Sequence, residues 1–203
     1  MLVCRLYVLT LTLCAGTACS SQDMNQPAAK TSAASCLPGE RGYLRAQLRG
    51  AIDAELDWRG ATLQCEGGAR PDGRGLRLSF LGPADTHGRQ LRLVFGVAAG
   101  PGLGLSHAVP TNVTVIVEGQ KQLYATQGDD RCTVESLVQE AVAAATGAAR
   151  SAAMHLYRVA ARGYCIDPAT ALDGSGRLYI NRFDFAGLVR YEDNELNAAT
   201  ANN

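Results

Sequence analysis

The stretch LRLSFLGPADTHGRQLRLVF, residues 76–95, contains two segments in which apolar and polar side chains alternate. In Leu76–Phe80 and again in Leu91–Phe95 every second residue is a leucine or a phenylalanine. A period of two places those side chains on one face of a β-strand. Between the two segments lies Gly82–Gly88, which is rich in turn-forming residues. The stretch therefore predicts an antiparallel hairpin with a long loop and one buried face.

The same pattern recurs on both sides of this hairpin. In Ile52–Trp58 apolar residues alternate with acidic ones, and Val113–Val117 is almost entirely β-branched, which favours strands. Further strands are expected at residues 123–126, 156–160 and 178–191, the last with Phe183 and Phe185 on one face. Short strands separated by Gly-rich turns predict a mainly β domain over residues 43–193, an antiparallel β-sandwich or barrel.

One segment departs from the strand pattern. Residues 133–153 contain the run Val134–Val142, followed by an Ala-rich tract that Gly147 interrupts. We predict one short helix near Val134–Val142, since Ala favours helix. The tract after it has almost no large apolar side chain to anchor a helix, so we expect a mobile loop there. The small and polar residues 194–203 predict a disordered tail.

The N-terminal residues indicate export. In MLVCRLYVLTLTLCAGTAC, residues 1–19, Arg5 precedes an apolar run that is too short to cross a bilayer core of ~30 Å and is typical of a signal peptide. The small residues before Cys19 resemble the cleavage box of bacterial lipoproteins. That resemblance implies removal of a signal peptide, residues 1–18, and attachment of lipid to Cys19. Cleavage by ordinary signal peptidase after Ala18, which would leave Cys19 as a free thiol, is the alternative.

The lipoprotein resemblance also implies a location. Residues 19–42 would form the lipid anchor and a flexible tether, because they contain no periodic apolar pattern. The residue after Cys19 is Ser20 and not Asp, which in a Gram-negative lipoprotein implies transfer to the outer membrane. We therefore expect a domain at the periplasmic face of that membrane, which it contacts through the lipid.

The cysteines predict two disulfides. Of the seven, Cys4 and Cys14 lie in the expected signal peptide and Cys19 is the lipidation candidate. The four that remain are an even set in an oxidising compartment, for which sequence alone allows three connectivities. We expect Cys36–Cys65 and Cys132–Cys165, since these pairs close the two shortest non-overlapping loops. No two of them have the C-x-x-C spacing of a metal or redox site, so no cofactor or metal is expected.

Four stretches in the second half resemble uncharacterised proteobacterial lipoproteins. They are Pro110–Thr114, Gln127–Thr133, Tyr157–Cys165 and Asn181–Gly187. The resemblance implies no activity. It places Cys132 and Cys165 in two similar contexts, in agreement with the expected pairing.

Charge argues against one class of partner. The formal net charge of the chain is zero at pH 7, and its arginines are scattered along the sequence. Binding to a phosphate backbone requires a basic patch. Nucleic acid is therefore not an expected partner.

Candidate catalytic and metal-binding motifs are incomplete. Gly104–Ala108 has the outline of a nucleophile elbow around Ser106, but a loop leads into it and Pro110 follows, where a helix is needed. The histidines are far apart in sequence and form no i, i+4 pair. Asp129–Asp130 and Asp173 lack the alternating acidic ligands of a calcium loop and are more typical of turns. No catalytic residue is therefore assigned.

Two features suggest binding surfaces. The Gly-rich loop Gly96–Pro110 is long, and loops on a β scaffold often carry recognition. Trp58 with Tyr43, Tyr124, Tyr179 and Tyr191 would form a sugar-stacking platform if all were exposed, although the parity of Trp58 favours the core. We expect a non-enzymatic binding module for a protein or glycan partner of the envelope. The alternatives are an envelope-associated hydrolase and a purely structural lipoprotein.

Overall fold

A computed structural model describes residues 36–37, 41–102, 104–142 and 154–193. These residues form an almost entirely β structure, as predicted. The strands are β1 (Tyr43–Gly50), β2 (Ala54–Arg59), β3 (Gln64–Ala69), β4 (Leu76–Leu81), β5 (Leu91–Val97), β6 (Gly104–Ser106), β7 (Val109–Val117), β8 (Gln122–Ala125), β9 (Cys132–Ala141), β10 (Met154–Cys165), β11 (Ala169–Ala171) and β12 (Arg177–Glu192). A short 3-10 helix, Gly60–Thr62, joins β2 to β3.

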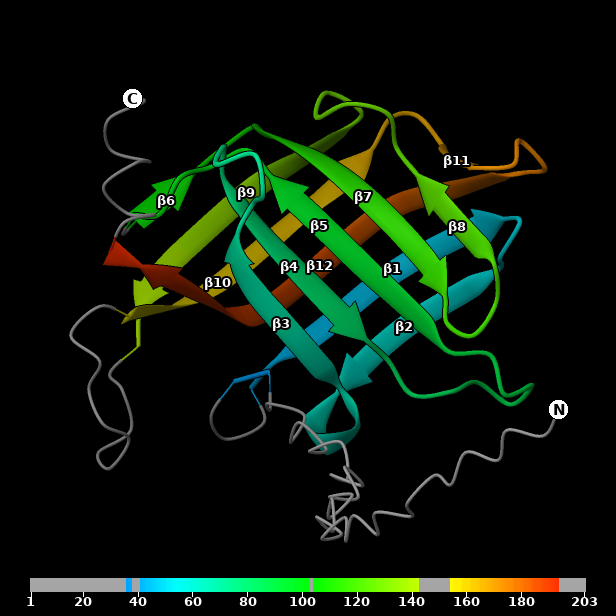
Figure 1. The fold of residues 1–203 in the computed structure, drawn as a ribbon, viewed down its shortest axis with the longest axis horizontal. Coiled ribbons are helices and arrows are strands. Elements are labelled where there is room, and N and C mark those ends of the chain that lie inside the picture. The colour runs from blue at the N-terminus through cyan, green and yellow to red at the C-terminus, as the bar shows by residue number, and fades with distance from the viewer. Residues whose placement is uncertain (1–35, 38–40, 103, 143–153, 194–203) are drawn as a thin grey trace, which may run out of the picture. The chain divides into compact units, whose positions relative to one another are not determined.

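The strands form two layers that cross each other in Figure 1. One layer has the order β3-β4-β5-β7-β8, and the other has the order β2-β1-β12-β10-β9-β6. Every pairing is antiparallel. Because β7 pairs with both β8 and β9, and β11 pairs with both β8 and β12, hydrogen bonds join the layers along one flank. The predicted antiparallel, sandwich-like fold is confirmed.

The core lies between the two layers. The β4–β5 hairpin forms as expected, and its inward side chains Phe80 and Phe95 are fully buried. From β12, Phe183 and Phe185 face them, with ring-centroid distances of 5.3 Å for Phe80–Phe185 and 4.9 Å for Phe95–Phe183. Burying one such ring stabilises the fold by about 1.5–3 kcal/mol, to which a well-placed aromatic pair adds about 0.5–1.5 kcal/mol. These four rings are the centre of the contact between layers.

Where β3 crosses β12 the two backbones approach closely. A Cβ atom on Gly67 would fall well inside the contact distance of the Leu188 carbonyl oxygen and 3.0 Å from Cγ2 of Val189. Only a residue without a side chain allows this approach. Gly67 therefore sets the spacing of the layers at this crossing.

The prediction of a helix near Val134–Val142 is wrong. These residues belong to strand β9, except Val142, which is the first residue after it. Arg162 pairs with Ser136 and Gly163 with Val134, so Glu135 is an extra residue that forms a β-bulge. Because of the bulge, the next side chain after Val134 that points into the core is Leu137, three residues later. Both side chains are fully buried. A strand with this defect places apolar residues three apart, which is the spacing of a helix. The expected loop after it falls on residues 143–153, outside the described residues.

A second bulge lies in β12. Gln47 of β1 pairs with Arg182 and Leu48 pairs with Ile180, so Asn181 has no partner in β1. As a result the buried residues change parity along the strand, from Ile180 to Phe183. Both Asn181 and Arg182 consequently face outward.

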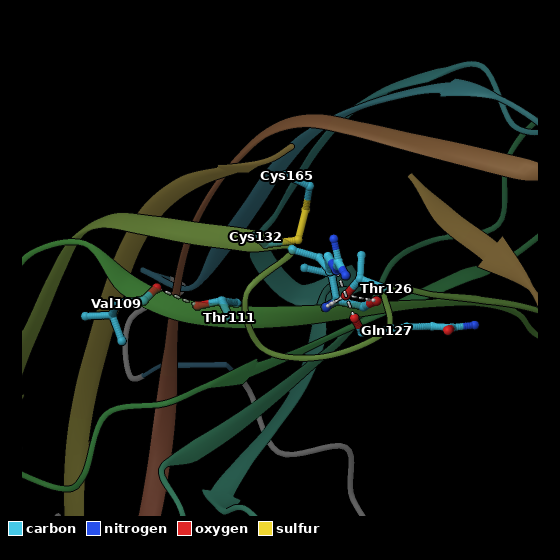
Figure 2. The surroundings of a disulfide bond; sticks show 8 residues. Val109, Thr111, Thr126, Gln127, Cys132 and Cys165 are labelled. Carbon is cyan, nitrogen blue, oxygen red and sulfur yellow. Dashed lines mark hydrogen bonds between the residues drawn. A yellow bond between two sulfur atoms is a disulfide. The ribbon is translucent and has the colours of Figure 1, made fainter. Parts of the chain in front are cut away.

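The structure contains both expected disulfides, Cys36–Cys65 and Cys132–Cys165. Cys132 and Cys165 are opposite each other in the register of β9 and β10, beside the point where β7 meets β9 (Figure 2). In the same region the Thr126 hydroxyl accepts a hydrogen bond from the backbone N–H of Val113, at 2.9 Å. The covalent bond and the polar contacts hold the flank where the layers join.

Several predictions concern residues that the structure does not describe. The signal peptide, Cys19, most of the tether and the tail 194–203 lie outside the described residues. Of residues 19–42, residues 36–37 and 41–42 are described, and Cys36 and Leu37 are buried. Among the described residues, no helix is long and apolar enough to cross a membrane.

Candidate functional site

A hollow lies over the outward face of the second layer. We call it the trough, and its volume is about 610 Å³. It crosses strands β1, β2, β12 and β10 and reaches the bulge of β9. Its lining residues are Arg45, Ala46, Gln47, Glu55, Leu56, Glu135, Arg162, Gly163, Tyr164, Asn181, Arg182, Phe183 and Asp184.

The two bulges place polar groups at this hollow. In a regular strand Asn181 and Arg182 would face opposite sides of the sheet, and the bulge lets both lie on the outer side. Glu135 is likewise the extra residue of β9 and is exposed. Bulges are frequent next to binding sites because they redirect side chains without changing the core. The trough is therefore a consequence of two local defects in the sheet.

Two carboxylates of the trough have close partners. Asp184 accepts a hydrogen bond from the Tyr43 hydroxyl at 2.8 Å, and Arg45 lies 3.5 Å from its other oxygen. Burial of the Tyr43 ring, together with this hydrogen bond and the Asp184 charge, raises the pKa of the Tyr43 hydroxyl above its usual value. Both carboxylate oxygens of Asp184 thus have a partner.

Glu55 is similarly engaged. Its Oε1 accepts hydrogen bonds from Gln47 Nε2 and from Arg49 Nη2, both at 2.7 Å. The hydrogen bond from Gln47 and the nearby guanidinium groups lower the pKa of the Glu55 carboxyl below its usual value. Glu55 is therefore ionised at neutral pH, which does not suit a general acid.

The two remaining arginines of the trough have few partners. Arg162 approaches Glu135 only at 3.9 Å, which is too long for a hydrogen bond. In the part of the chain that the structure describes, Arg182 makes no hydrogen bond and no ion pair within 4 Å. A guanidinium group has five N–H donors. The trough thus combines occupied carboxylates with guanidinium donors that are still available.

A smaller hollow of about 310 Å³ lies beside the Gly-rich loop expected as a contact surface. Part of Gly96–Pro110 is strand, because β5 runs to Val97, β6 occupies Gly104–Ser106 and β7 begins at Val109. The side chain of Gln139 is buried there and donates from Nε2 to the Gly100 carbonyl oxygen at 3.0 Å. Its Oε1 has no hydrogen-bond partner among the described residues. Backbone groups form most of this hollow, which gives it less side-chain chemistry than the trough.

The catalytic and metal-binding candidates of the sequence lie in strands and turns. Ser106 lies in β6 and strand β7 follows, so the helix of a nucleophile elbow is not formed there. His107 Nδ1 lies 3.0 Å from the Glu135 carbonyl oxygen, and His155 Nε2 lies 2.7 Å from Asp193. Asp173 accepts the N–H of Ser175, as in an ordinary turn. Over the described residues, no three His, Cys, Asp or Glu side chains gather as metal ligands.

The proposed sugar-stacking platform does not form. Trp58 is buried, as its parity suggested, and packs on Gly82. Tyr124 and Tyr191 are also buried. Only Tyr179 of this group is strongly exposed. Among the lining residues of the trough, the exposed aromatic one is instead Tyr164, which is 38% exposed.

Sequence reasoning did not find the trough, because its residues come from five strands and form no motif. One signal was present in the sequence. The apolar positions of the last strand change parity between Ile180 and Phe183, which indicates a bulge and two consecutive outward residues. No comparable signal in the sequence shows which residues of β1 and β10 lie beside Arg182 in the sheet.

Comparison of the chain with protein-family models, with curated proteins and with solved structures finds no match.

Proposed function

We propose that the protein is a non-enzymatic binding module of the cell envelope, attached by lipid on Cys19 at the periplasmic face of the outer membrane, and that it binds a glycan in the trough. The observation that supports a glycan as the ligand is the set of side chains that line the trough. Amide, carboxylate and guanidinium side chains surround an exposed tyrosine, Tyr164, in a volume of about 610 Å³. Attachment through Cys19 rests on the resemblance of residues 1–19 to lipoprotein signals.

A saccharide matches this composition. Its hydroxyl groups both donate and accept hydrogen bonds. Asn181 offers an amide oxygen, and Gln47, whose Nε2 already donates to Glu55 at 2.7 Å, keeps a second N–H. The less polar face of a sugar ring packs on an aromatic side chain, the role we assign to Tyr164. A trough of this size is in the range of ligand sites, about 300–1,000 Å³.

Isothermal titration calorimetry of the protein with maltose, chitobiose and digalacturonate tests this function. We expect binding of at least one of the three and a loss of affinity of about ten-fold in Tyr164→Ala, as for the removal of one stacking contact. Tyr179→Ala is the matched control, because Tyr179 is 45% exposed and lies outside the trough. Its affinity should equal that of the unmodified protein.

Two results would contradict the proposal. If none of the three sugars binds, or if both tyrosine variants bind as the unmodified protein does, the trough is not a glycan site. Binding of an envelope protein that Tyr164→Ala abolishes would point to the protein partner instead. Cleavage of a bound sugar during the titration, detected by chromatography, would identify a hydrolase.

A further inference from the structure

We propose that the glycan of the trough is anionic, and that Arg162 and Arg182 together bind its oxyanion, a carboxylate or a phosphate. This inference rests on the proposed glycan-binding function. It narrows the ligand from saccharides in general to those that carry a negative charge.

The two arginines are neighbours on one face of the sheet. Arg162 of β10 is directly opposite Asp184 of β12 in the antiparallel register. Arg182 is two residues from Asp184 and, beyond the bulge, faces the same side. Arg162 and Arg182 are therefore diagonal neighbours, a position in which side chains lie about 7–8 Å apart at their origins. Two long side chains at this spacing reach one shared ligand between them.

The guanidinium N–H donors of Arg162 and Arg182 are available to a ligand. The contact of Arg162 with Glu135 is 3.9 Å long, and within the described residues Arg182 has neither a hydrogen bond nor an ion pair within 4 Å. Planar guanidinium groups bind carboxylate and phosphate with two parallel hydrogen bonds. A neutral sugar would leave most of these charged donors to water, whereas an oxyanion uses them.

The carboxylates around the trough do not prevent anion binding. Asp184 is paired with Arg45 and with the Tyr43 hydroxyl, and Glu55 is paired with Arg49 at 2.7 Å. Arg182 lies near enough to Glu55 to help lower the pKa of that carboxyl, and Glu135 lies 3.9 Å from Arg162. Glu135 competes weakly with the ligand at Arg162, and its removal should therefore strengthen the binding of an anion.

The test compares charged with neutral probes by calorimetry. The probes are digalacturonate and its dimethyl ester, and maltose 1-phosphate and maltose, so that each pair compares an anionic sugar with a neutral one of the same ring skeleton. We expect at least one anionic probe to bind at least ten-fold more tightly than its neutral partner. That advantage should fall with added NaCl, because salt screens exposed charges. Comparison of the two pairs identifies the carboxylate or the phosphate as the preferred group.

Three variants locate the binding. Arg162→Gln and Arg182→Gln should each lower the affinity for the anionic probe by about ten-fold, as for the loss of a hydrogen bond to a charged group. Glu135→Gln should raise that affinity. Arg190→Gln is the matched control, because Arg190 is an exposed residue of the same strand, outside the trough, and about 26 Å from Arg182 along it. Thermal unfolding of each variant checks that the fold is intact.

The outcomes separate this inference from the function on which it rests. Equal affinity for the charged and neutral members of both pairs, with Tyr164→Ala still impaired, would overturn the anionic ligand and leave a glycan site. A charge preference that Arg190→Gln lowers as much as Arg182→Gln does would overturn the assignment to this pair. Binding of none of the probes would overturn both proposals.

Discussion

Gly67 and Gly68 are adjacent in β3 but have different surroundings. A methyl group on Gly67 would meet the Leu188 carbonyl oxygen and the side chain of Val189, whereas one on Gly68 would lie 3.5 Å from the Arg190 carbonyl oxygen, an ordinary contact. We expect Gly67→Ala to lower the free energy of unfolding by about 1–3 kcal/mol, the usual effect of overpacking. Urea denaturation of the variant measures this change.

Gly68→Ala is the matched control for that substitution. Its backbone needs no positive φ and its added methyl group has room, so the free energy of unfolding should stay within about 0.5 kcal/mol of the original or rise slightly. Equal stability of the two variants would contradict the inference that β3 and β12 approach each other closely at Gly67.

Tyr43 provides a test of the electrostatics at the edge of the trough. Burial, the hydrogen bond to Asp184 and the charge of that carboxylate all disfavour the phenolate, so the pKa of Tyr43 lies above its usual value. The variant Asp184→Asn lacks the negative charge, so the pKa of Tyr43 should fall toward its usual value. Burial of the ring should still hold that pKa above the usual value. A pH titration of the ¹³Cζ resonance of Tyr43 measures both values. An unchanged pKa in the variant would show that Asp184 does not act on Tyr43.

At the level of elements, the Cys132–Cys165 bond supports the flank where the layers join. It closes a sequence separation of 33 residues, for which the chain-entropy model gives about 3–4 kcal/mol of stabilisation. We expect the double variant Cys132→Ala/Cys165→Ala to lose about that amount in guanidinium denaturation under oxidising conditions. A loss under about 1 kcal/mol would mean that the β7–β9 and β9–β10 pairings suffice without the bond.

Most strands were predictable because their side chains follow a simple period. The segments around Phe80 and Phe95 have an apolar side chain at every second position, and the segment around Val115 is almost entirely β-branched. Each is a strand with those residues buried. The prediction failed at β9, where the extra residue Glu135 changes the period. A bulge depends on pairing with a distant strand, here β10, and local sequence contains no record of that pairing. The trough was missed for the same reason, since Asn181 faces outward only through a bulge against β1.

At the level of the whole molecule, the fold class followed from the sequence but the arrangement of the strands did not. Alternation shows which side of a strand is buried, and it does not show which strands are neighbours. That β7 pairs with β5, β8 and β9, and that the short β11 joins β8 to β12, depends on contacts between distant parts of the chain. Both disulfides agree with the choice of the shortest loops, and for Cys132 and Cys165 that choice coincides with the register of β9 and β10.

The proposed attachment of the whole molecule has a direct test. Mass spectrometry of the protein from its native membranes, without reductant, should show a mature chain that begins at a diacylated or triacylated Cys19, with the other four cysteines in two bonds. Cys19→Ser should release the protein from the membrane fraction, because stable anchoring depends on the acyl chains. An unlipidated chain in the unmodified protein would overturn the membrane attachment and leave the trough proposals standing.

The Cys36–Cys65 bond has a mechanical consequence for a protein held by its N-terminal segment. Tension applied ahead of residue 36 passes through the two sulfur atoms to Cys65 in β3, because the covalent bond is much stiffer than the chain between the two cysteines. Residues 37–64, which include β1 and β2, cannot then be drawn out of the fold by that force. These strands supply Arg45, Gln47 and Glu55 to the trough. With the proposed lipid attachment and the proposed glycan in the trough, drag between membrane and ligand would load the β3–β4 pairing first and spare these strands.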